Sequence, residues 1–171
     1  MAVYGQPRMR VRQMRAREQH LHFLFLAAAE VFGHLQRQCG ALRGESALPA
    51  RPLVSVVDDD ESVRESLPDL LKVLGFSVRA FSSAEAFLAS DCIGQTRCLL
   101  LDIAMPGMSG PDLQRELLHR QQNIPIVFIT AHSDEAVRQS LLKAGAIDCL
   151  LKPFGDAALL GAINAALKST D

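Results

Sequence analysis

Four consecutive acidic residues, Asp58 to Glu61, directly follow the apolar run LVSVV at 53–57. Such a cluster has three interpretations: a solvated loop, acidic residues at the start of a helix, or one wall of a cation site. Asp60 and Glu61 suit a first helical turn, where the helix dipole stabilises negative charge. For Asp58 and Asp59, the local sequence leaves a helix N-cap and a cation ligand both open.

Five short apolar runs alternate with five stretches of helical periodicity. The predicted strands are residues 53–57, 76–81, 97–102, 124–130 and 146–151, and the predicted helices are residues 61–75, 82–89, 109–120, 134–144 and 155–168. Ser82 and Glu85 have the spacing of a capping box at the second helix. Strands that are apolar on both faces and separated by helices favour parallel pairing. We therefore predict an α/β fold with a doubly wound, five-stranded parallel sheet.

In an open parallel sheet, functional groups collect beyond the carboxyl ends of the strands. Those ends carry Asp58 and Asp59 on the first strand, Asp102 on the third, Thr130 on the fourth and Lys152 on the fifth. Two carboxylates about 4 Å apart repel by roughly 4 kcal/mol at an effective dielectric constant near 20. Lys152 and a divalent cation would offset this repulsion, and Mg²⁺ fits best because it leaves positions for a phosphate. These groups suit phosphoryl transfer through an aspartyl phosphate.

The first 51 residues differ in composition from the rest of the chain. They contain eight arginines, no lysine and three acidic residues, whereas residues 52–171 contain ten basic and sixteen acidic residues. The stretch GESALPARP at 44–52 has the composition of a linker. We predict a basic N-terminal extension and linker at 1–51, helical or disordered, and one domain at 52–171. The acidic excess of that domain argues against nucleic-acid binding.

The segment LHFLFLAAAEVF at 21–32 imitates a signal peptide, because it follows an arginine-rich stretch. It is shorter than the roughly 20 apolar residues that span a membrane, and its apolar positions also fit one face of a helix. The extension is therefore either an interaction helix or chain translated upstream of the functional start. The four cysteines show no CxxC pairing, which favours reduced thiols. We expect a cytoplasmic protein without membrane association.

Four ordered motifs, VVDDDESVRESL, LLLDIAMPGMSG, IPIVFITAH and KAGAIDCLLKPF, together resemble a response-regulator receiver domain of the CheY-like superfamily. The likeness covers residues 53–168, with separations of 28 from Asp102 to Thr130 and 22 from Thr130 to Lys152. The stretches SVRESL, FSSAEAFL and MPGMSG are most similar to the FixJ-type branch. The resemblance implies the flavodoxin-like (βα)5 fold of receiver domains.

The resemblance also implies a role for each residue at the strand ends. Asp102 would be the phosphoacceptor, receiving its phosphoryl group from a phosphohistidine on a sensor histidine kinase. Thr130 and Lys152 would contact phosphoryl oxygens, and the Lys152–Pro153 bond would be cis. The implied Mg²⁺ ligands are Asp59, Asp102, the backbone carbonyl of Ala104 and, through water, Asp58. The resemblance thus predicts a phosphorylated signalling protein rather than an enzyme.

Two residues depart from the family pattern. Cys149 stands where the family usually has the Tyr or Phe that takes part in read-out, and Ala104 is small where longer polar side chains are common. Ala104 is therefore expected to change access of the hydrolytic water and the lifetime of the phosphoryl group.

FixJ-type regulators normally continue into a helix-turn-helix domain, whereas this sequence ends at Asp171. We therefore expect a stand-alone receiver that acts through contacts with an unknown downstream protein target. The alternatives are an output-less remnant of a transcription regulator or a phosphoryl sink in a phosphorelay. A phosphatase of the aspartyl-phosphate class, whose DxD motif Asp58 and Asp60 match in form, is disfavoured by the MPGMSG turn and by the position of Lys152.

Overall fold

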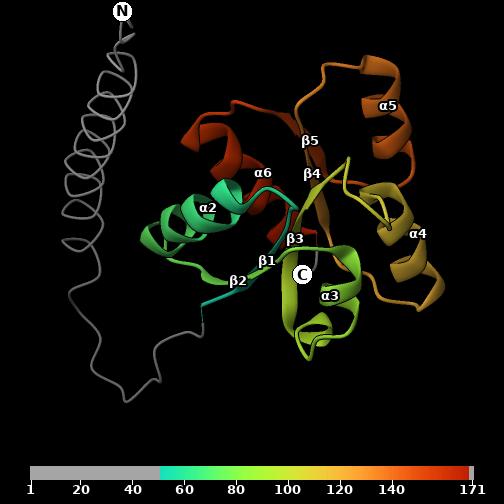
Figure 1. Ribbon diagram of the computed structural model, residues 1–171. Helices are drawn as coiled ribbons and strands as arrows, with labels where there is room; N and C mark the ends of the chain where they lie inside the picture. The colour runs from blue at the N-terminus through green and yellow to red at the C-terminus, as the bar shows by residue number, and fades with distance from the viewer. Residues whose placement is uncertain (1–50, 170–171) are drawn as a thin grey trace, which may run out of the picture. The chain divides into compact units, whose positions relative to one another are not determined.

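A single parallel sheet forms the centre of the computed structural model, which describes residues 51–169 (Figure 1). The strands are β1 (Leu53–Val57), β2 (Ser77–Phe81), β3 (Thr96–Asp102), β4 (Ile126–Thr130) and β5 (Asp148–Leu151). They pair in the order β2-β1-β3-β4-β5, and every pairing is parallel. Apart from Arg51, the predictions for the extension at 1–51 lie outside the described residues.

Five α-helices connect or follow these strands. They are α2 (Glu61–Val73), α3 (Ala84–Leu88), α4 (Gly110–His119), α5 (Glu135–Lys143) and α6 (Asp156–Lys168). A short 3-10 helix, η1 (Ile93–Gln95), precedes β3 and was not predicted. The predicted flavodoxin-like five-stranded α/β fold is confirmed. In the part of the chain that the structure describes, every helix is too short or too polar to cross a membrane.

The fourth and fifth strands each begin two residues later than the sequence predicts. At the start of β4, Pro125 has no backbone N–H to donate, although its carbonyl oxygen accepts a hydrogen bond from the Leu99 N–H at 2.9 Å. The chain therefore reaches β3 before the regular ladder begins at Ile126. The hydrophobic pattern alone does not show whether an apolar residue at the start of the run already belongs to the regular ladder or only lies beside the neighbouring strand.

Side-chain caps fix where the first two helices begin. Asp60 is the N-cap of α2, and its carboxylate accepts a hydrogen bond from the Ser62 N–H at 2.8 Å, which confirms that Asp60 and Glu61 begin this helix. Ser83 is the N-cap of α3, with its hydroxyl accepting from the Ala86 N–H. The predicted capping box of Ser82 and Glu85 is therefore wrong, because the extended backbone of Ser83 places the cap one residue later.

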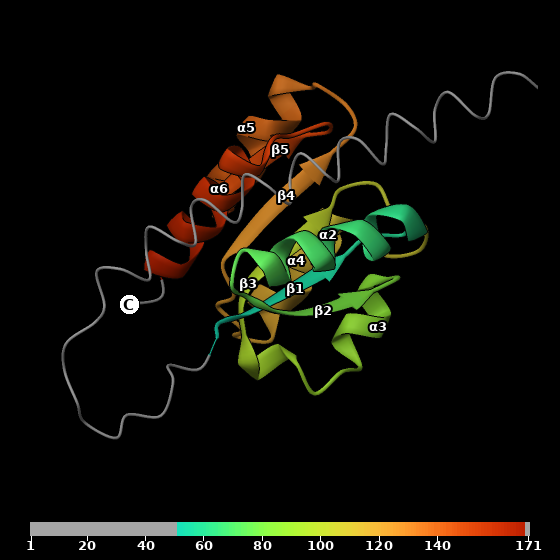
Figure 2. The ribbon, with the colours of Figure 1, turned by 90° about the vertical axis from the view of Figure 1, so that its left-hand side faces the viewer.

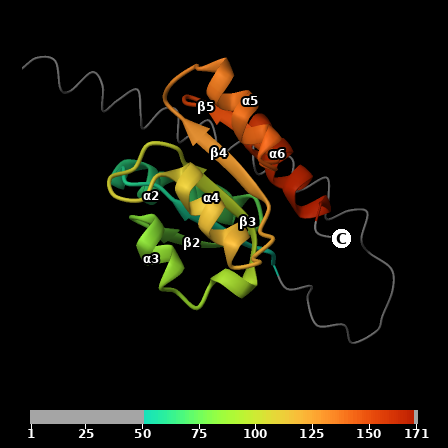
Figure 3. The ribbon, with the colours of Figure 1, turned by 90° about the vertical axis from the view of Figure 1, so that its right-hand side faces the viewer.

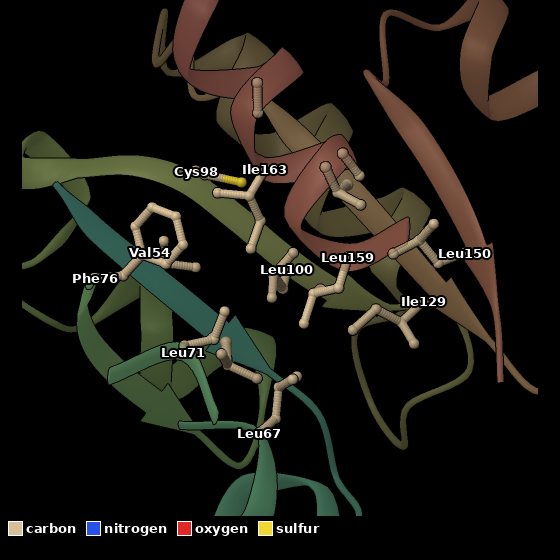
Figure 4. Packing of buried hydrophobic residues seen from close by; sticks show 14 residues of the cluster. Val54, Leu67, Leu71, Phe76, Cys98, Leu100, Ile129, Leu150, Leu159 and Ile163 are labelled. Carbon is tan, nitrogen blue, oxygen red and sulfur yellow. The ribbon is translucent and has the colours of Figure 1, made fainter. Parts of the chain in front are cut away.

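Helices α2 and α6 cover one face of the sheet. Figure 4 shows Leu71 of α2 and Leu159 and Ile163 of α6 packed around Val54 and Leu100 of the central strands. All five of these side chains are completely buried. In Figure 2, α2 lies in front of β1 and β2. The spacing of the apolar residues in both helices, three or four positions apart, produces this single packed face.

Helices α3, α4 and α5 cover the opposite face, which Figure 3 shows with α4 in front of the sheet. Phe87 of α3 and Leu113 and Leu117 of α4 pack against Leu101 and Phe128 from neighbouring strands. Each strand therefore supplies apolar side chains to both faces, as expected for a sheet covered on both sides. The two packed faces hold the strands in register and so fix the positions of their carboxyl ends.

Truncation of a central core residue should measurably destabilise this arrangement. We expect Leu100→Ala to lower the free energy of unfolding by about 2–5 kcal/mol, because the residue is completely buried and leaves a cavity. Leu118→Ala is the matched control, since that side chain is 52% exposed and its loss should change stability by less than about 0.5 kcal/mol. Urea denaturation followed by circular dichroism measures both. Equal effects of the two variants would contradict this description of the core.

Candidate functional site

The strand order brings residues from distant parts of the sequence to one edge of the sheet. β1 and β3 are neighbours, with Val57 paired to Leu101, so that Asp58 and Asp102 follow side by side. On the other side of β3, Thr130 at the end of β4 is paired with Leu151 of β5, directly before Lys152. These positions all lie at the carboxyl edge, where functional groups of parallel sheets collect.

The Lys152 ammonium group bridges two buried carboxylates. Its Nζ donates to Asp58 Oδ2 at 2.7 Å and to Asp102 Oδ1 at 2.8 Å. Asp58 is only 1% exposed and Asp102 7%, whereas the Lys152 side chain is 24% exposed. Because both carboxylates contact one cation, their mutual repulsion is offset at the point where it would be greatest. The structure thus brings together three of the predicted site residues.

Backbone donors hold the other oxygen of each carboxylate. Asp58 Oδ1 accepts from the Asp60 N–H at 2.9 Å, and Asp102 Oδ2 accepts from the Ala104 N–H at 2.8 Å. Arg64 of α2 donates from Nη1 to the Asp58 carbonyl oxygen at 3.0 Å, which places a second cation beside the site. Every carboxylate oxygen of the buried pair therefore has a partner, which fixes the orientation of both side chains.

The carboxylates also change the acidity of Lys152. Burial by itself would lower the pKa of this ammonium group, but the hydrogen bonds to Asp102 and Asp58 and their negative charges outweigh burial. The pKa of Lys152 is therefore raised above its ordinary value. At neutral pH the side chain is fully protonated and carries three N–H donors, two of which the carboxylates use.

Asp59, unlike Asp58 and Asp102, is exposed. Within residues 51–169, no group of three or more His, Cys, Asp or Glu side chains has the spacing of a metal site. The chemistry of the donors nevertheless fits Mg²⁺, which is bound by carboxylate and carbonyl oxygens. Asp58, Asp59, Asp102 and the Ala104 carbonyl provide such oxygens at or directly after the carboxyl ends of β1 and β3.

The Thr130 hydroxyl group makes its hydrogen bonds within its own loop. It donates to the His132 carbonyl oxygen at 3.2 Å and accepts from the His132 N–H at 3.1 Å. The Thr130 carbonyl oxygen accepts from the Lys152 N–H at 2.7 Å, so the backbone links these two predicted site residues. The Lys152–Pro153 bond is cis, as predicted.

Gly110, the first residue of α4, lies in unusually close contact with the phosphoacceptor candidate. A Cβ atom at this position would lie 2.3 Å from the Asp102 carbonyl oxygen and 3.1 Å from the Phe128 ring. The Gly110 N–H also donates to the Ile103 carbonyl oxygen at 3.1 Å. Only glycine therefore allows the start of α4 to close the short loop that follows Asp102.

A cavity of about 170 Å³ lies beside Thr130, between β5 and the start of α5. Ile103, Val137, Cys149 and Leu151 contribute its apolar lining. Cys149 is the position where the family usually has an aromatic residue, so the smaller thiol borders this space. Burial raises the pKa of Cys149, although the nearby charge of Arg138 opposes the shift, and the thiol is therefore protonated at neutral pH.

Sequence reasoning missed three residues that shape the site. Arg64 belongs to the apolar-polar pattern of α2 and carries no signal of its contact with Asp58. Gly110 follows Ser109 in the MPGMSG turn, and a glycine just inside a predicted helix could have indicated close backbone packing. Glu85, taken as a capping-box residue, instead accepts a hydrogen bond from the Met108 N–H at 3.1 Å, in the loop after Asp102.

Comparison with known proteins gives the class to which this fold and site belong. The family model described as the response regulator receiver domain matches residues 54–164. The chain therefore belongs to the response-regulator receiver-domain family, whose members serve in two-component signal transduction. Receiver domains are generally signalling proteins that are phosphorylated by sensor histidine kinases and bind Mg²⁺ at their acidic site.

Individual relatives share substantial identity with the chain. It is 43% identical over 136 residues to the response regulator protein TmoT of Ectopseudomonas mendocina, covering 78% of this chain and 61% of TmoT. It is 46% identical over 116 residues to the response regulator protein TodT of Pseudomonas putida, covering 68% of this chain and 51% of TodT. The chain thus spans between half and two thirds of the length of these relatives.

Solved structures agree with this assignment. The response regulator StyR is 51% identical with a TM-score of 0.65, over 70% of this chain and 61% of StyR. The N-terminal part of FixJ is 42% identical with a TM-score of 0.62, over 68% of this chain and 93% of that structure. The predicted resemblance to receiver domains, including FixJ, is confirmed.

Substitution of Gly110 tests the contact between α4 and Asp102. We expect Gly110→Ala to lower the free energy of unfolding by about 1–3 kcal/mol, because the new Cβ overlaps the Asp102 carbonyl oxygen. Gly161→Ala in α6 is the matched control, since nothing lies within 4 Å of a Cβ there, and it should gain about 0.5–1 kcal/mol. Thermal or urea denaturation compares them. A neutral Gly110→Ala variant would contradict the close approach.

Substitution of Lys152 tests its contribution to the buried carboxylate pair. We expect Lys152→Met to lower the free energy of unfolding by about 1–3 kcal/mol, because Asp58 and Asp102 lose their shared donor. Adding Asp102→Asn should recover part of the loss, since only one buried charge then remains. Urea denaturation at neutral pH measures the double-mutant cycle. Purely additive effects would show that these side chains do not interact.

The raised pKa of Lys152 sets how this contribution depends on pH. Below about pH 10.4, the ordinary lysine value, the side chain is protonated in the folded and the unfolded chain, so the contribution is fully present. It is lost as the pH rises through the raised pKa of the folded state. The stability difference between wild type and Lys152→Met should therefore be constant from about pH 7 to 10 and narrow above that range.

Proposed function

We propose that this chain is the phosphoacceptor of a two-component system, phosphorylated on Asp102 by a sensor histidine kinase and acting through protein contacts. The observation that carries the proposal is the Lys152 ammonium group, which donates to a buried Asp102 oxygen at 2.8 Å. A cation at this position can neutralise charge that develops on a transferred phosphoryl group. The buried surroundings strengthen that interaction relative to bulk water.

In the proposed reaction, a carboxylate oxygen of Asp102 attacks the phosphorus atom of a phosphohistidine. The new O–P bond forms as the N–P bond breaks, and the leaving imidazole nitrogen takes up a proton. The Ala104 N–H holds Asp102 Oδ2 at 2.8 Å and so presents the carboxylate in a fixed orientation. Lys152 loses part of its contact with the carboxylate and gains one with the added phosphoryl oxygens.

Mg²⁺ is the metal that the oxygen donors of this site support. Asp59, Asp102 and the Ala104 carbonyl would bind it directly, and Asp58 through water. When bound, Mg²⁺ supplies positive charge to phosphoryl oxygens that Lys152 does not contact. The buried Asp58 would keep its contact with Lys152, which holds that cation close to Asp102.

Thr130 is proposed to carry the change from the phosphorylation site to the surrounding surface. Within the described residues, its hydroxyl group forms hydrogen bonds only with the backbone of His132, to the N–H at 3.1 Å and to the carbonyl oxygen at 3.2 Å. A phosphoryl group on Asp102 adds about −1.5 to −2 charge and strong acceptor oxygens. Reorientation of the hydroxyl group toward these oxygens would release His132 and shift the β4–α5 loop.

The proposed partners are therefore a sensor histidine kinase and an unidentified downstream protein, in the cytoplasm and without direct contact to nucleic acid. Relatives of the chain include proteins named as transcriptional regulatory protein FixJ, so a role in transcriptional regulation or as a phosphoryl sink is an alternative for the same phosphorylated site. The phosphatase alternative has less support, because Asp60, the second acid of its DxD motif, is exposed and caps α2.

Phosphorylation in vitro tests the proposal. Incubation with acetyl phosphate and Mg²⁺ should give a shifted band in Phos-tag electrophoresis, and Asp102→Asn should abolish it, because the carboxylate nucleophile is gone. Asp69→Asn is the matched control, since this aspartate is 78% exposed on α2 and should leave the shifted band unchanged. An unshifted wild type, or an Asp102→Asn variant that shifts equally, would refute Asp102 as the acceptor.

A further inference from the structure

The side chain of Glu85 links α3 to the loop that follows Asp102. Its Oε1 accepts a hydrogen bond from the Met108 N–H at 3.1 Å, across 23 residues of sequence. Ser83 caps α3 with its own hydroxyl group, so Glu85 is not needed to begin that helix. Glu85 therefore makes a long-range contact in addition to its local contacts with its own backbone and with Ser83.

The loop from Ile103 to Ser109 is held at several points that all bear on Asp102. The Ala104 N–H donates to Asp102 Oδ2, the Met105 side chain is buried, and the Gly110 N–H donates to the Ile103 carbonyl oxygen. These contacts come from the loop itself or from its two ends. Glu85 contacts the loop from a different helix, at Met108 near the C-terminal end of the loop.

The loop is also shaped to receive the Glu85 carboxylate. Gly107 has a φ of +76°, and a Cβ atom there would lie 3.0 Å from Glu85 Oε1. A side chain at position 107 would therefore crowd the carboxylate as well as strain the backbone. Hydrogen bonds from its own backbone, from Ser83 and from Met108 lower the pKa of Glu85, so the acceptor is ionised at neutral pH.

We propose that Glu85 is a positioning residue for phosphorylation: by holding the Met108 N–H, it keeps the Ala104 backbone in place beside Asp102. The Ala104 N–H orients the Asp102 carboxylate, and the Ala104 carbonyl is a ligand of the proposed Mg²⁺ site. Loss of the Glu85 contact loosens both at once. This inference rests on the proposed function of Asp102.

The test compares Glu85→Ala and Glu85→Gln with wild type in the full chain. The initial rate of phosphorylation by acetyl phosphate is measured as a function of Mg²⁺ concentration. We expect Glu85→Ala to raise the half-saturating Mg²⁺ concentration on the order of tenfold, as is usual when support of a metal ligand is lost. Glu85→Gln keeps an acceptor oxygen for the Met108 N–H and should stay within about threefold of wild type.

Glu65→Ala is the matched control, because Glu65 is an exposed glutamate of α2 and should leave the Mg²⁺ dependence unchanged. If Glu85 had a purely structural role, Glu85→Ala would lower the stability of the protein in urea without changing the Mg²⁺ dependence of the phosphorylation rate. If Glu85→Ala matches wild type at all Mg²⁺ concentrations, or if Glu85→Gln is as defective as Glu85→Ala, the proposed role is wrong.

Hydrogen exchange at the Met108 amide separates failure of this inference from failure of the proposed function. We expect this amide to exchange about tenfold faster in Glu85→Ala than in wild type, whether or not the protein is phosphorylated. An unphosphorylated wild type would refute the proposed function and with it the role of Glu85 in phosphorylation. Unchanged exchange at Met108 in Glu85→Ala would instead refute the contact itself.

Discussion

The ammonium group of Lys152 is the interaction on which the rest of the site depends. Parallel pairing of β1 and β3 forces Asp58 and Asp102 into adjacent buried positions, where two negative charges would repel strongly without a cation. Neighbouring strands lie about 4.8 Å apart, so Lys152, which follows β5, has to reach past the end of β4. The strand order therefore decides both that the two carboxylates lie together and that the Lys152 ammonium group can reach them.

The strand order also divides the site into a fixed part and an adjustable part. Asp58 and Asp102 extend directly from the two central strands, and backbone N–H groups hold their second oxygens. Thr130 and Lys152 follow β4 and β5, on the other side of β3, and are joined by a backbone hydrogen bond of 2.7 Å. Within the described residues, the Thr130 hydroxyl group forms its hydrogen bonds with His132 of its own loop. The proposed phosphoryl group on Asp102 would therefore act on the part of the site that follows β4 and β5, while β1 and β3 stay in place.

The loop after Asp102 is short, and its geometry depends on two glycines that larger residues cannot replace without a steric clash. Gly110 lets α4 begin against the Asp102 carbonyl oxygen, and Gly107 leaves room for the Glu85 carboxylate. The two glycines of the MPGMSG motif thus meet two separate steric requirements: Gly110 avoids a clash with the sheet, and Gly107 avoids a clash with Glu85 of α3. Each glycine has a different neighbour, and only the folded chain identifies that neighbour.

The sequence by itself determined the five strands, the five helices and the strand ends that carry acidic, hydroxyl and ammonium groups, because these follow from local hydrophobic periodicity. It also indicated, through resemblance, the receiver-domain family and the cis bond before Pro153. Only the tertiary structure decided that Lys152 contacts both Asp58 and Asp102, that Asp59 is exposed, and that Glu85 accepts a hydrogen bond from Met108. Such contacts join residues 23 to 94 positions apart, and local pattern contains no information about how side chains so distant in sequence meet.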